Sequence, residues 1–296
     1  MRNRAQTNQT YSHSFSLPPR RVPSLPVRFT LNSLGAPNWT LEETATRARA
    51  YGYDGVDLRL LDGEVITLQS VGANKARIKS LFALNDLPVA VLATSVRLAT
   101  RDPGVRAQTL DEAHQWIDLA AELGVPVIRY FAARNPPELQ LDDAIQAVGE
   151  MLALLSERAT QAGVKIGVET HDEFASAATV ARALELAPNH QVGAIWDMWH
   201  TARAGETPAQ ALAALDSRVL NVHLKDARRA GGQWQLVLLG EGDIPVRDGL
   251  RLLKHSGYDG FISVEWEKKW HPEIAEPEEA FPRHLSVLRE YMAELG

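Results

Sequence analysis

The sequence of 296 residues predicts a single α/β domain with the architecture of a (β/α)8 TIM barrel. From Val27 onward, eight short apolar runs alternate with longer amphipathic stretches, the pattern of parallel strands joined by helices. Hydrophobic residues make up 45% of the chain and charged residues 23%, which is enough for one large core. An open doubly wound sheet usually begins with a glycine-rich phosphate turn, and the turn after the first run has only Gly35. The regular alternation therefore favours a closed barrel.

The expected strands and helices follow one another along the whole chain after Val27. The strands have the usual length of about five or six residues and are Val27–Asn32, Gly55–Arg59, Val89–Thr94, Val127–Phe131, Lys165–Glu169, Val192–Asp197, Val219–Leu224 and Gly260–Glu265. The helices, with apolar residues three and four positions apart, include Leu41–Ala50, Leu110–Leu123, Asp142–Ala162, Ala177–Leu186, Arg247–Lys254 and Glu279–Glu294. We expect residues 27–296 to form the barrel and residues 1–26 a flexible tail.

Charge and composition indicate a small-molecule ligand. The net charge of −6 offers no basic surface to a nucleic acid and would mildly repel an anionic membrane. No apolar run approaches the ~20 residues that span a bilayer. The absence of cysteine fits a cytoplasmic location and leaves carboxylates and imidazoles as metal ligands. Trp266 and Trp270 are candidates to close a pocket or to join two copies of the chain, which leaves a homo-oligomer open.

Four successive strands present metal-ligating side chains at their ends. Active sites of TIM barrels lie at the C-terminal ends of the strands, where this chain has Glu169, Asp197, His223 and Glu265. Any one of them could instead cap a loop or pair with a lysine or arginine. Converging carboxylates repel one another, however, and each unit of pKa displacement costs about 1.4 kcal/mol, so a bound cation is the simplest compensation. We expect one divalent ion, with Mn2+ first and Mg2+, Co2+ or Zn2+ as alternatives.

Three further polar residues follow these expected ligands. His171 and Lys225 each lie two residues after a ligand, so on a continuing strand each points to the same side as that ligand. His200 lies three residues after the expected aspartate ligand, where a general acid/base or a hydroxyl-binding group would stand. We expect all three to contact substrate or move protons.

Three arginines mark the ends of earlier strands. Arg59, Arg97 and Arg129 lie at or near the ends of the second, third and fourth expected strands. One interpretation is that they form salt bridges to the ligand carboxylates. The other is that they bind a phosphate or carboxylate of the substrate opposite the metal. Both interpretations stay open at the level of sequence.

At these residues the sequence resembles the xylose isomerase-like barrel superfamily, which contains sugar isomerases and epimerases, inosose and dehydroshikimate dehydratases, and endonuclease IV. The resemblance covers nearly everything after Val27 and rests on Val168–Asp172, Trp196–His200, Val222–Asp226, Leu239–Pro245 and Gly257–Pro272. It implies metal binding by the four ligands named above and contact of His200 with substrate. Glu241, in the fourth segment, becomes a further candidate for substrate binding.

The resemblance implies proton transfer as the chemistry. In epimerase members, one ligand glutamate removes a proton beside a carbonyl and the other returns a proton on the opposite face, while the metal stabilises the enediolate. This implies Glu169 and Glu265 as the proton-transferring pair, acting on a small sugar, sugar phosphate or polyol. Ketose 3-epimerases carry a further glutamate where this chain has Ala175, which argues against that substrate. Endonuclease IV needs histidines in the early strands, and the first four expected strands have none.

Two alternatives accompany the isomerase or epimerase reading. Metal-dependent dehydroshikimate dehydratases share the Glu-x-His, Asp-x-x-His and His-x-Lys pairings, with the first histidine as base. That likeness implies a lyase in which His171 and Lys225 move protons as water leaves a keto-cyclitol or dehydroshikimate-type substrate. The second alternative is a non-catalytic sugar-binding barrel, which would bind a ligand without proton exchange at carbon.

Overall fold

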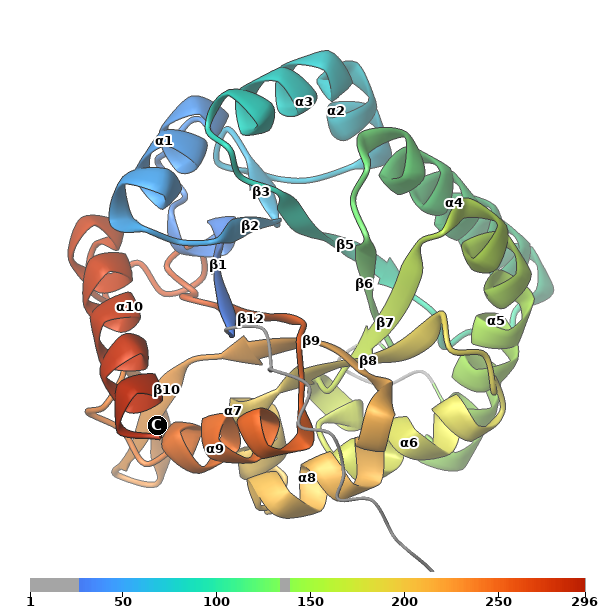
Figure 1. The fold of residues 1–296 in the computed structure, drawn as a ribbon. Coiled ribbons are helices and arrows are strands. Elements are labelled where there is room, and N and C mark those ends of the chain that lie inside the picture. Colours follow the sequence, from blue (N-terminus) through green and yellow to red (C-terminus); the bar gives the residue numbers. More distant parts are fainter. Residues whose placement is uncertain (1–26, 134–138, 296) are drawn as a thin grey trace, which may run out of the picture.

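Eight parallel strands close into a barrel in the computed structural model, which describes residues 27–133 and 139–295 (Figure 1). This confirms the predicted fold class, and the expected tail at residues 1–26 lies outside the described residues. Each barrel strand pairs in parallel with its neighbours in chain order, and the last pairs with the first. In that order the strands are β1 (Arg28–Asn32), β2 (Gly55–Leu58), β5 (Val89–Arg97), β6 (Val127–Phe131), β7 (Lys165–Glu169), β8 (Val192–Asp197), β9 (Val219–Leu224) and β12 (Phe261–Val264).

Helices surround the barrel and cover the outward side of its strands (Figure 1). They are α1 (Leu41–Tyr51), α2 (Leu68–Ala73), α3 (Lys75–Leu84), α4 (Pro103–Leu123), α5 (Leu141–Ala162), α6 (Ala177–Glu185), α7 (Met198–Arg203), α8 (Pro208–Leu215), α9 (Val246–Ser256) and α10 (Pro277–Glu294). α4 begins at Pro103 rather than at the expected Leu110, because the Asp102 side chain accepts from the Val105 N–H and proline suits a first helical turn.

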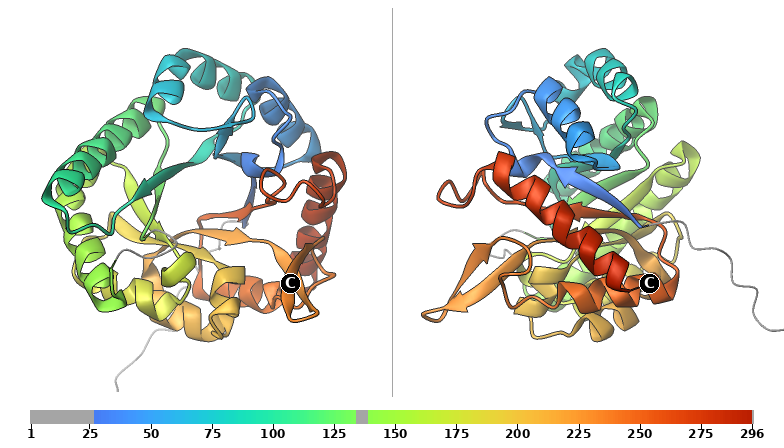
Figure 2. Two further views of the ribbon diagram at one scale, coloured as in Figure 1. Left: turned by 180° about the vertical axis from the view of Figure 1, so that it is seen from behind. Right: turned by 60° about the vertical axis from the view of Figure 1, so that its left-hand side comes forward.

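Two short hairpins follow barrel strands: β3 (Leu60–Leu61) with β4 (Glu64–Val65), and β10 (Asp226–Ala230) with β11 (Gln233–Val237). The β10–β11 turn uses Gly231 and Gly232, whose φ angles of 59° and 83° suit glycine and match a two-residue hairpin turn. In the side view of Figure 2, this orange hairpin projects past one end of the barrel. Because β10 comes directly after β9 and Lys225, that end carries the C-terminal ends of the strands.

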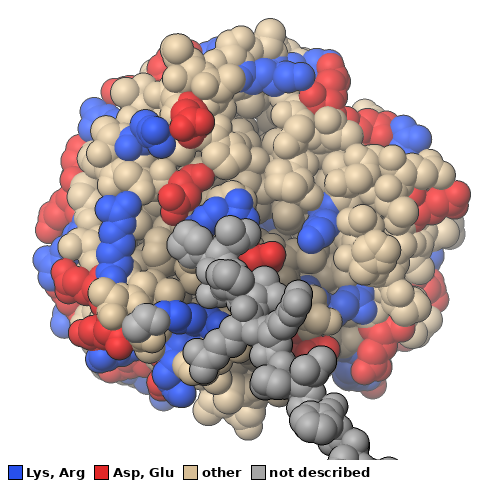
Figure 3. Space-filling view, viewed as in Figure 1, with Lys and Arg blue, Asp and Glu red and all other residues tan. Residues whose placement is uncertain are grey.

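Surface charge is mixed on the face in Figure 3, where Lys and Arg alternate with Asp and Glu. Exposed and partly exposed side chains also form ion pairs, as Arg77 does with both Glu42 and Asp62. In the two described ranges, no helix is both long and apolar enough to cross a membrane.

Candidate metal centre

The four predicted ligands meet at the C-terminal end of the barrel. Glu169 ends β7, Asp197 ends β8, His223 lies in β9, and Glu265 follows β12 directly. Each offers one ligand atom within 4.8 Å of those of the other three, and all four side chains are buried. Since parallel strands end at the same side of a sheet, successive strand ends bring these residues together.

His223 and Lys225 each contact more than one carboxylate of this cluster. His223 Nδ1 lies 2.6 Å from Glu169 Oε1 and 3.3 Å from Glu265 Oε1. The fully buried Lys225 Nζ lies 2.5 Å from both Asp197 Oδ2 and Glu265 Oε2, and 3.0 Å from Glu267 Oε1. Lys225 thus lies among the carboxylates of the cluster, and its role toward substrate stays a prediction.

The pKa values of these groups show the balance between burial and charge. Burial raises the pKa of Asp197, and although Lys225 opposes this, the pKa reaches about 6. Burial also acts to raise the pKa of Glu169, but Arg129 and His223 outweigh it and lower the pKa. Burial lowers the pKa of His223, and Glu265 and Glu169 outweigh it, so the pKa is raised. Three carboxylates and one imidazole at this spacing are a fitting donor set for a hard or borderline divalent cation.

A row of tilted, closely packed rings lines one side of the site. The His171 ring centroid lies 4.8 Å from that of Phe131 and 4.2 Å from that of His200. The row continues from His200 to Trp199 at 4.8 Å, and Lys225 Nζ lies 5.2 Å from the Trp199 ring. A wall of this kind can pack against the apolar face of a sugar-like ring and keep water out.

The two histidines of this wall differ in their surroundings. His171 Nδ1 lies 3.0 Å from Asp172 Oδ2; burial lowers the pKa of His171, but Asp172 and Glu169 outweigh it and raise the pKa. Asp172 itself adopts a φ of 49°, a strained backbone conformation of the kind often found beside functional residues. Burial holds the pKa of His200 well below its usual value, and its buried Nε2 has no hydrogen-bond partner in the described structure.

The three predicted arginines gather around Phe131. Their guanidinium carbons lie 3.9 Å (Arg129), 4.6 Å (Arg97) and 5.9 Å (Arg59) from its ring centroid. Arg129 Nη1 lies 3.1 Å from Glu169 Oε2. This contact agrees with the interpretation in which an arginine forms a salt bridge to a ligand carboxylate.

Arg59 is different, because its Nη1 donates to neutral groups, the Ala93 carbonyl at 3.0 Å and the Ser95 hydroxyl at 2.8 Å. Burial and then Arg129 lower the pKa of Arg59 to about 9. Within residues 27–133 and 139–295, the structure gives Arg59 no ion pair with a carboxylate.

The segment around Glu241 is organised by Asp226. One or other Asp226 carboxylate oxygen accepts from the backbone N–H groups of Gly240 (2.9 Å), Gly242 (3.0 Å) and Ile244 (3.3 Å). The Glu241 side chain pairs with Arg283 of α10 and is about half exposed. Two segments singled out in the sequence, Val222–Asp226 and Leu239–Pro245, thus form one structure beside the metal site.

Asn32 and Glu267 contact the cluster although neither was predicted as a site residue. Asn32, at the end of β1, has Nδ2 3.4 Å from Glu265 Oε1. Glu267 contacts Lys225 from the loop after β12. The strand-end rule applied to the first strand would have found Asn32, and the spacing of two residues after a ligand, which singled out His171 and Lys225, would have found Glu267 after Glu265.

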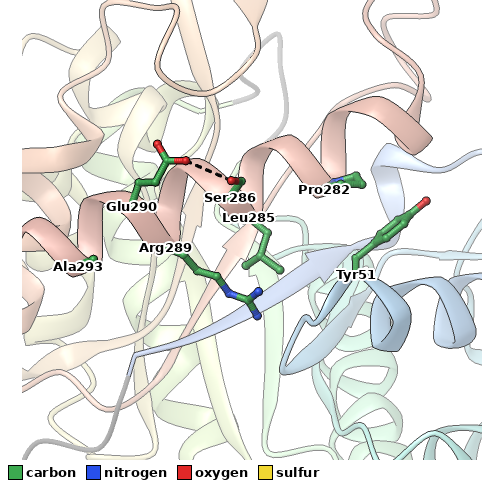
Figure 4. Close-up of a pocket in the computed structure, with 7 residues that line it drawn as sticks. All are labelled: Tyr51, Pro282, Leu285, Ser286, Arg289, Glu290 and Ala293. Atoms are coloured by element: carbon green, nitrogen blue, oxygen red, sulfur yellow. Dashed lines mark hydrogen bonds between the residues drawn. The ribbon is translucent and has the colours of Figure 1, made fainter.

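Another hollow lies on the outside of the barrel (Figure 4), lined by Tyr51 and by the α10 residues Pro282, Leu285, Ser286, Arg289, Glu290 and Ala293. Its polar groups are largely satisfied, because Ser286 donates to Glu290 at 3.2 Å and Arg289 to the Gly52 carbonyl at 2.7 Å. The residues that line it include only one of the metal-ligating types, Glu290. This hollow therefore lacks the group of ligands that a metal site needs.

A model of the family described as xylose isomerase-like TIM barrel matches residues 45–291, most of the chain. The chain belongs to this family.

Two curated proteins are similar in sequence to this xylose isomerase-like barrel. YihM of Escherichia coli, an uncharacterised protein, is 22% identical over 199 residues, which cover 65% of this chain and 56% of YihM. An inosose isomerase of Halalkalibacterium halodurans is 23% identical over 225 residues, covering 72% of this chain and 78% of the relative. The chain therefore spans little more than half the length of the first of these relatives.

Solved structures share the fold of this xylose isomerase-like barrel. The IolI protein, which has a bound zinc atom, gives a TM-score of 0.77 at 17% identity, covering 91% of this chain and 99% of IolI. The 3-keto-D-glucoside 4-epimerase YcjR of E. coli gives a TM-score of 0.71 at 19% identity, covering 88% of this chain and 98% of YcjR. The probable 3-DHS dehydratase AsbF of Bacillus anthracis gives a TM-score of 0.70 at 15% identity, covering 89% of this chain and 99% of AsbF. At these identities the likeness establishes the fold alone.

Proposed function

We propose that this protein is a divalent-metal-dependent isomerase or epimerase of a small sugar, sugar phosphate or polyol. The observation that carries the proposal is the buried cluster of Glu169, Asp197, His223 and Glu265, with ligand atoms within 4.8 Å of one another. The relative named inosose isomerase and the fold neighbour named as a 4-epimerase support this reaction class.

Mn2+ is the ion we propose for this cluster. Three oxygen ligands and one nitrogen ligand without a thiolate suit Mn2+, and the zinc atom in IolI makes Zn2+ the main competitor. When bound, the ion would polarise the substrate carbonyl and offset the negative charge that develops as a proton leaves the adjacent carbon.

Glu169 and Glu265 are the proposed proton carriers. β8 and β9 lie between the strands that bear them, so the two carboxylates approach the centre from different sides. One oxygen of each is held by a cation, Glu169 Oε2 by Arg129 and Glu265 Oε2 by Lys225. In the proposed step, one carboxylate takes the proton as the C–H bond breaks, and the other, which must carry a proton before the step, gives it to the opposite face of the same carbon. In an isomerase the proton goes instead to the former carbonyl carbon, while the hydroxyl proton of the neighbouring carbon passes to the former carbonyl oxygen. Exchange of protons with water then returns both carboxylates to their starting states.

Arg59 supports a substrate that carries an anionic group. A buried charge is costly unless it is paired, and the described partners of Arg59 are a carbonyl and a hydroxyl. Arg97 and Arg129 lie around the same Phe131 ring, so positive charge gathers on this side of the site. A phosphate or carboxylate would pair with this guanidinium while the carbonyl end of the substrate lies toward the carboxylates.

A dehydratase is the second candidate, supported by the His171–His200 pair. Their ring centroids lie 4.2 Å apart, and His200 Nε2 has no partner in the described structure. Both glutamates are instead engaged by cations, which makes them poorer bases than a histidine. In this reaction, His171 would take the proton beside the carbonyl and a neighbouring acid would protonate the departing hydroxyl, releasing water. The fold neighbour AsbF is named a probable dehydratase.

The test is a screen of ketoses, sugar phosphates, inososes and dehydroshikimate with the Mn2+-loaded protein in D2O, followed by NMR. An isomerase or epimerase incorporates deuterium at the carbon beside the carbonyl and yields an isomer, whereas a dehydratase yields an enone and water. Binding without deuterium incorporation would instead indicate a sugar-binding barrel and reject both enzyme proposals.

Variants then separate the two mechanisms. The glutamate-pair mechanism predicts that Glu265→Gln abolishes exchange, with metal content checked because Glu265 is also a proposed ligand. If His171→Ala abolishes turnover while Glu265→Gln keeps exchange, the glutamate-pair mechanism is rejected in favour of the histidine.

A further inference from the structure

Asp57 is a buried carboxylate beneath the metal centre. It lies in β2 between Val56 and Leu58, which pack in the core, so by strand alternation its side chain points into the barrel. Asp57 is 0% exposed, and neither carboxylate oxygen has a hydrogen-bond partner in the described structure. A carboxylate in this position is costly unless another group compensates it.

The group that faces Asp57 is the proposed ligand His223. His223 Nε2 lies 3.6 Å from Asp57 Oδ2, and Nε2 also has no hydrogen-bond partner in the described structure. The other ring nitrogen, Nδ1, lies 2.6 Å from Glu169 Oε1 on the side of the metal centre. The imidazole therefore stands between the ligand carboxylates and Asp57.

We propose that Asp57 is a positioning residue that accepts the Nε2–H of His223 and so directs Nδ1 toward the metal ion. The inference rests on the metal-binding part of the proposed function. A neutral imidazole that binds a metal through Nδ1 carries its proton on Nε2. Pairing this N–H with Asp57 satisfies two buried groups at once, fixes the tautomer and makes Nδ1 a better donor. A shift of a few tenths of an ångström brings the two atoms within hydrogen-bond distance.

Hydration of the barrel interior is the competing explanation. The buried hydroxyls of Thr30 and Ser263 also lack partners in the described structure, and Ser263 pairs in register with both His223 and Thr30. Ordered water could join these groups to Asp57 without any role for Asp57 toward the metal. In that case the loss of either Asp57 or Thr30 would leave metal affinity nearly unchanged.

The first experiment is calorimetric titration of Mn2+ into metal-stripped wild-type, Asp57→Asn and Thr30→Val proteins, with circular dichroism to establish folding. Because partners of ligating histidines typically contribute 10-fold to 100-fold in affinity, Asp57→Asn is expected to weaken Mn2+ binding by about that factor. Thr30→Val, which removes a buried hydroxyl of the same interior, is expected to stay within about twofold of wild type. An Asp57→Asn protein that binds Mn2+ within twofold of wild type overturns the proposal.

A second experiment needs no substitution of Asp57. In 15N-histidine-labelled wild type loaded with diamagnetic Zn2+, the His223 signals are assigned by their loss in His223→Gln. The proposal predicts a protonated Nε2 with a downfield, slowly exchanging proton, and a protonated Nδ1 overturns it. Neither readout depends on turnover. If Asp57→Asn loses affinity but the wild type shows no exchange in D2O, the inference stands and the proposed activity falls.

Discussion

Lys225 shows at the residue scale how a buried cation compensates the carboxylates of the site. Its side chain is fully buried and contacts Asp197, Glu265 and Glu267, and these carboxylates raise its pKa even though burial lowers it. A buried ion pair contributes little net stability, but removing one partner leaves the other charges buried without compensation.

Lys225→Met should therefore destabilise the metal-free protein strongly. We expect a loss of about 3–5 kcal/mol in the free energy of unfolding, measured by urea denaturation. The matched control is Lys75→Met, since Lys75 pairs with Glu122 at the surface and such pairs contribute about 0–1 kcal/mol. Equal losses of unfolding free energy in the two variants would show that Lys225 does not compensate the negative charge of the buried carboxylates.

Arg59 should determine whether anions bind. In Arg59→Gln we expect the Kd for a sugar phosphate, or for inorganic phosphate as a probe, to rise at least about tenfold, since a charge-assisted bond contributes roughly 1.5–3 kcal/mol. Binding of a neutral sugar should change little. The control is Arg101→Gln, because Arg101 forms an exposed pair with Asp143. Unchanged phosphate binding in Arg59→Gln would remove the argument for an anionic substrate.

At the scale of elements, the segment Leu239–Pro245 depends on Asp226. The Asp226 carboxylate gathers three backbone N–H groups of this segment and comes directly after Lys225 in the chain. The Asp226 carboxylate can approach this segment because Gly242 has no side chain. A Cβ added at Gly242 would lie 2.0 Å from Asp226 Oδ1 and 2.6 Å from the Ala227 carbonyl oxygen.

Gly242→Ala should accordingly displace the segment. We expect a loss of about 1–3 kcal/mol in unfolding free energy, as for other overpacked sites. We also expect weaker Mn2+ binding, because a shift of Asp226 moves the adjacent Lys225, which contacts the proposed ligands Asp197 and Glu265. Gly72→Ala in α2 is the control, since its Cβ would meet nothing within 4 Å and alanine favours a helix. A Gly242→Ala protein as stable as Gly72→Ala would contradict this account of the segment.

Packing of α10 on the same segment makes stability depend on pH. The buried His284 accepts from the Leu239 N–H at 3.3 Å, and burial lowers the pKa of His284 to about 3. The unfolded chain takes up this proton near pH 6.5, so the stabilisation is present above pH 6.5 and is lost as the pH falls toward 3.

From pH 7.5 to 5.5, wild type should therefore lose about 1.4 kcal/mol more unfolding free energy than His284→Gln does. Urea denaturation at the two pH values gives the difference, with His190→Gln as an exposed-histidine control that keeps the wild-type dependence. If His284→Gln and wild type lose stability in parallel, His284 is not the group that titrates.

Some elements of the fold were easier to predict than others. The strands ending in Glu169 and Asp197 were predicted to the residue, because an apolar run stops at a carboxylate. The β10–β11 hairpin was missed although Gly231-Gly232 signals a two-residue turn, because β10 contains adjacent charges. Asp57 was missed because a mid-strand aspartate has no local signal, and only barrel closure brings it near His223.

At the scale of the whole molecule, the barrel draws its three arginines and its proposed metal ligands from different strands. Arg59, Arg97 and Arg129 come from the β2, β5 and β6 region, whereas the proposed ligands come from β7, β8, β9 and the end of β12. Parallel closure puts both groups at one end of the barrel, where a substrate with a carbonyl at one end and an anion at the other would span them. Sequence order alone predicted this division, because strand neighbours in a TIM barrel follow chain order.

Binding of one divalent ion by the four buried ligands is tested most directly by calorimetric titration of Mn2+ into the chelator-stripped protein. We predict one site per chain in wild type and at least about a tenfold loss of affinity in His223→Gln, with the exposed variant His190→Gln unchanged. Absence of Mn2+ and Zn2+ binding in wild type, or wild-type affinity in His223→Gln, would contradict the claim.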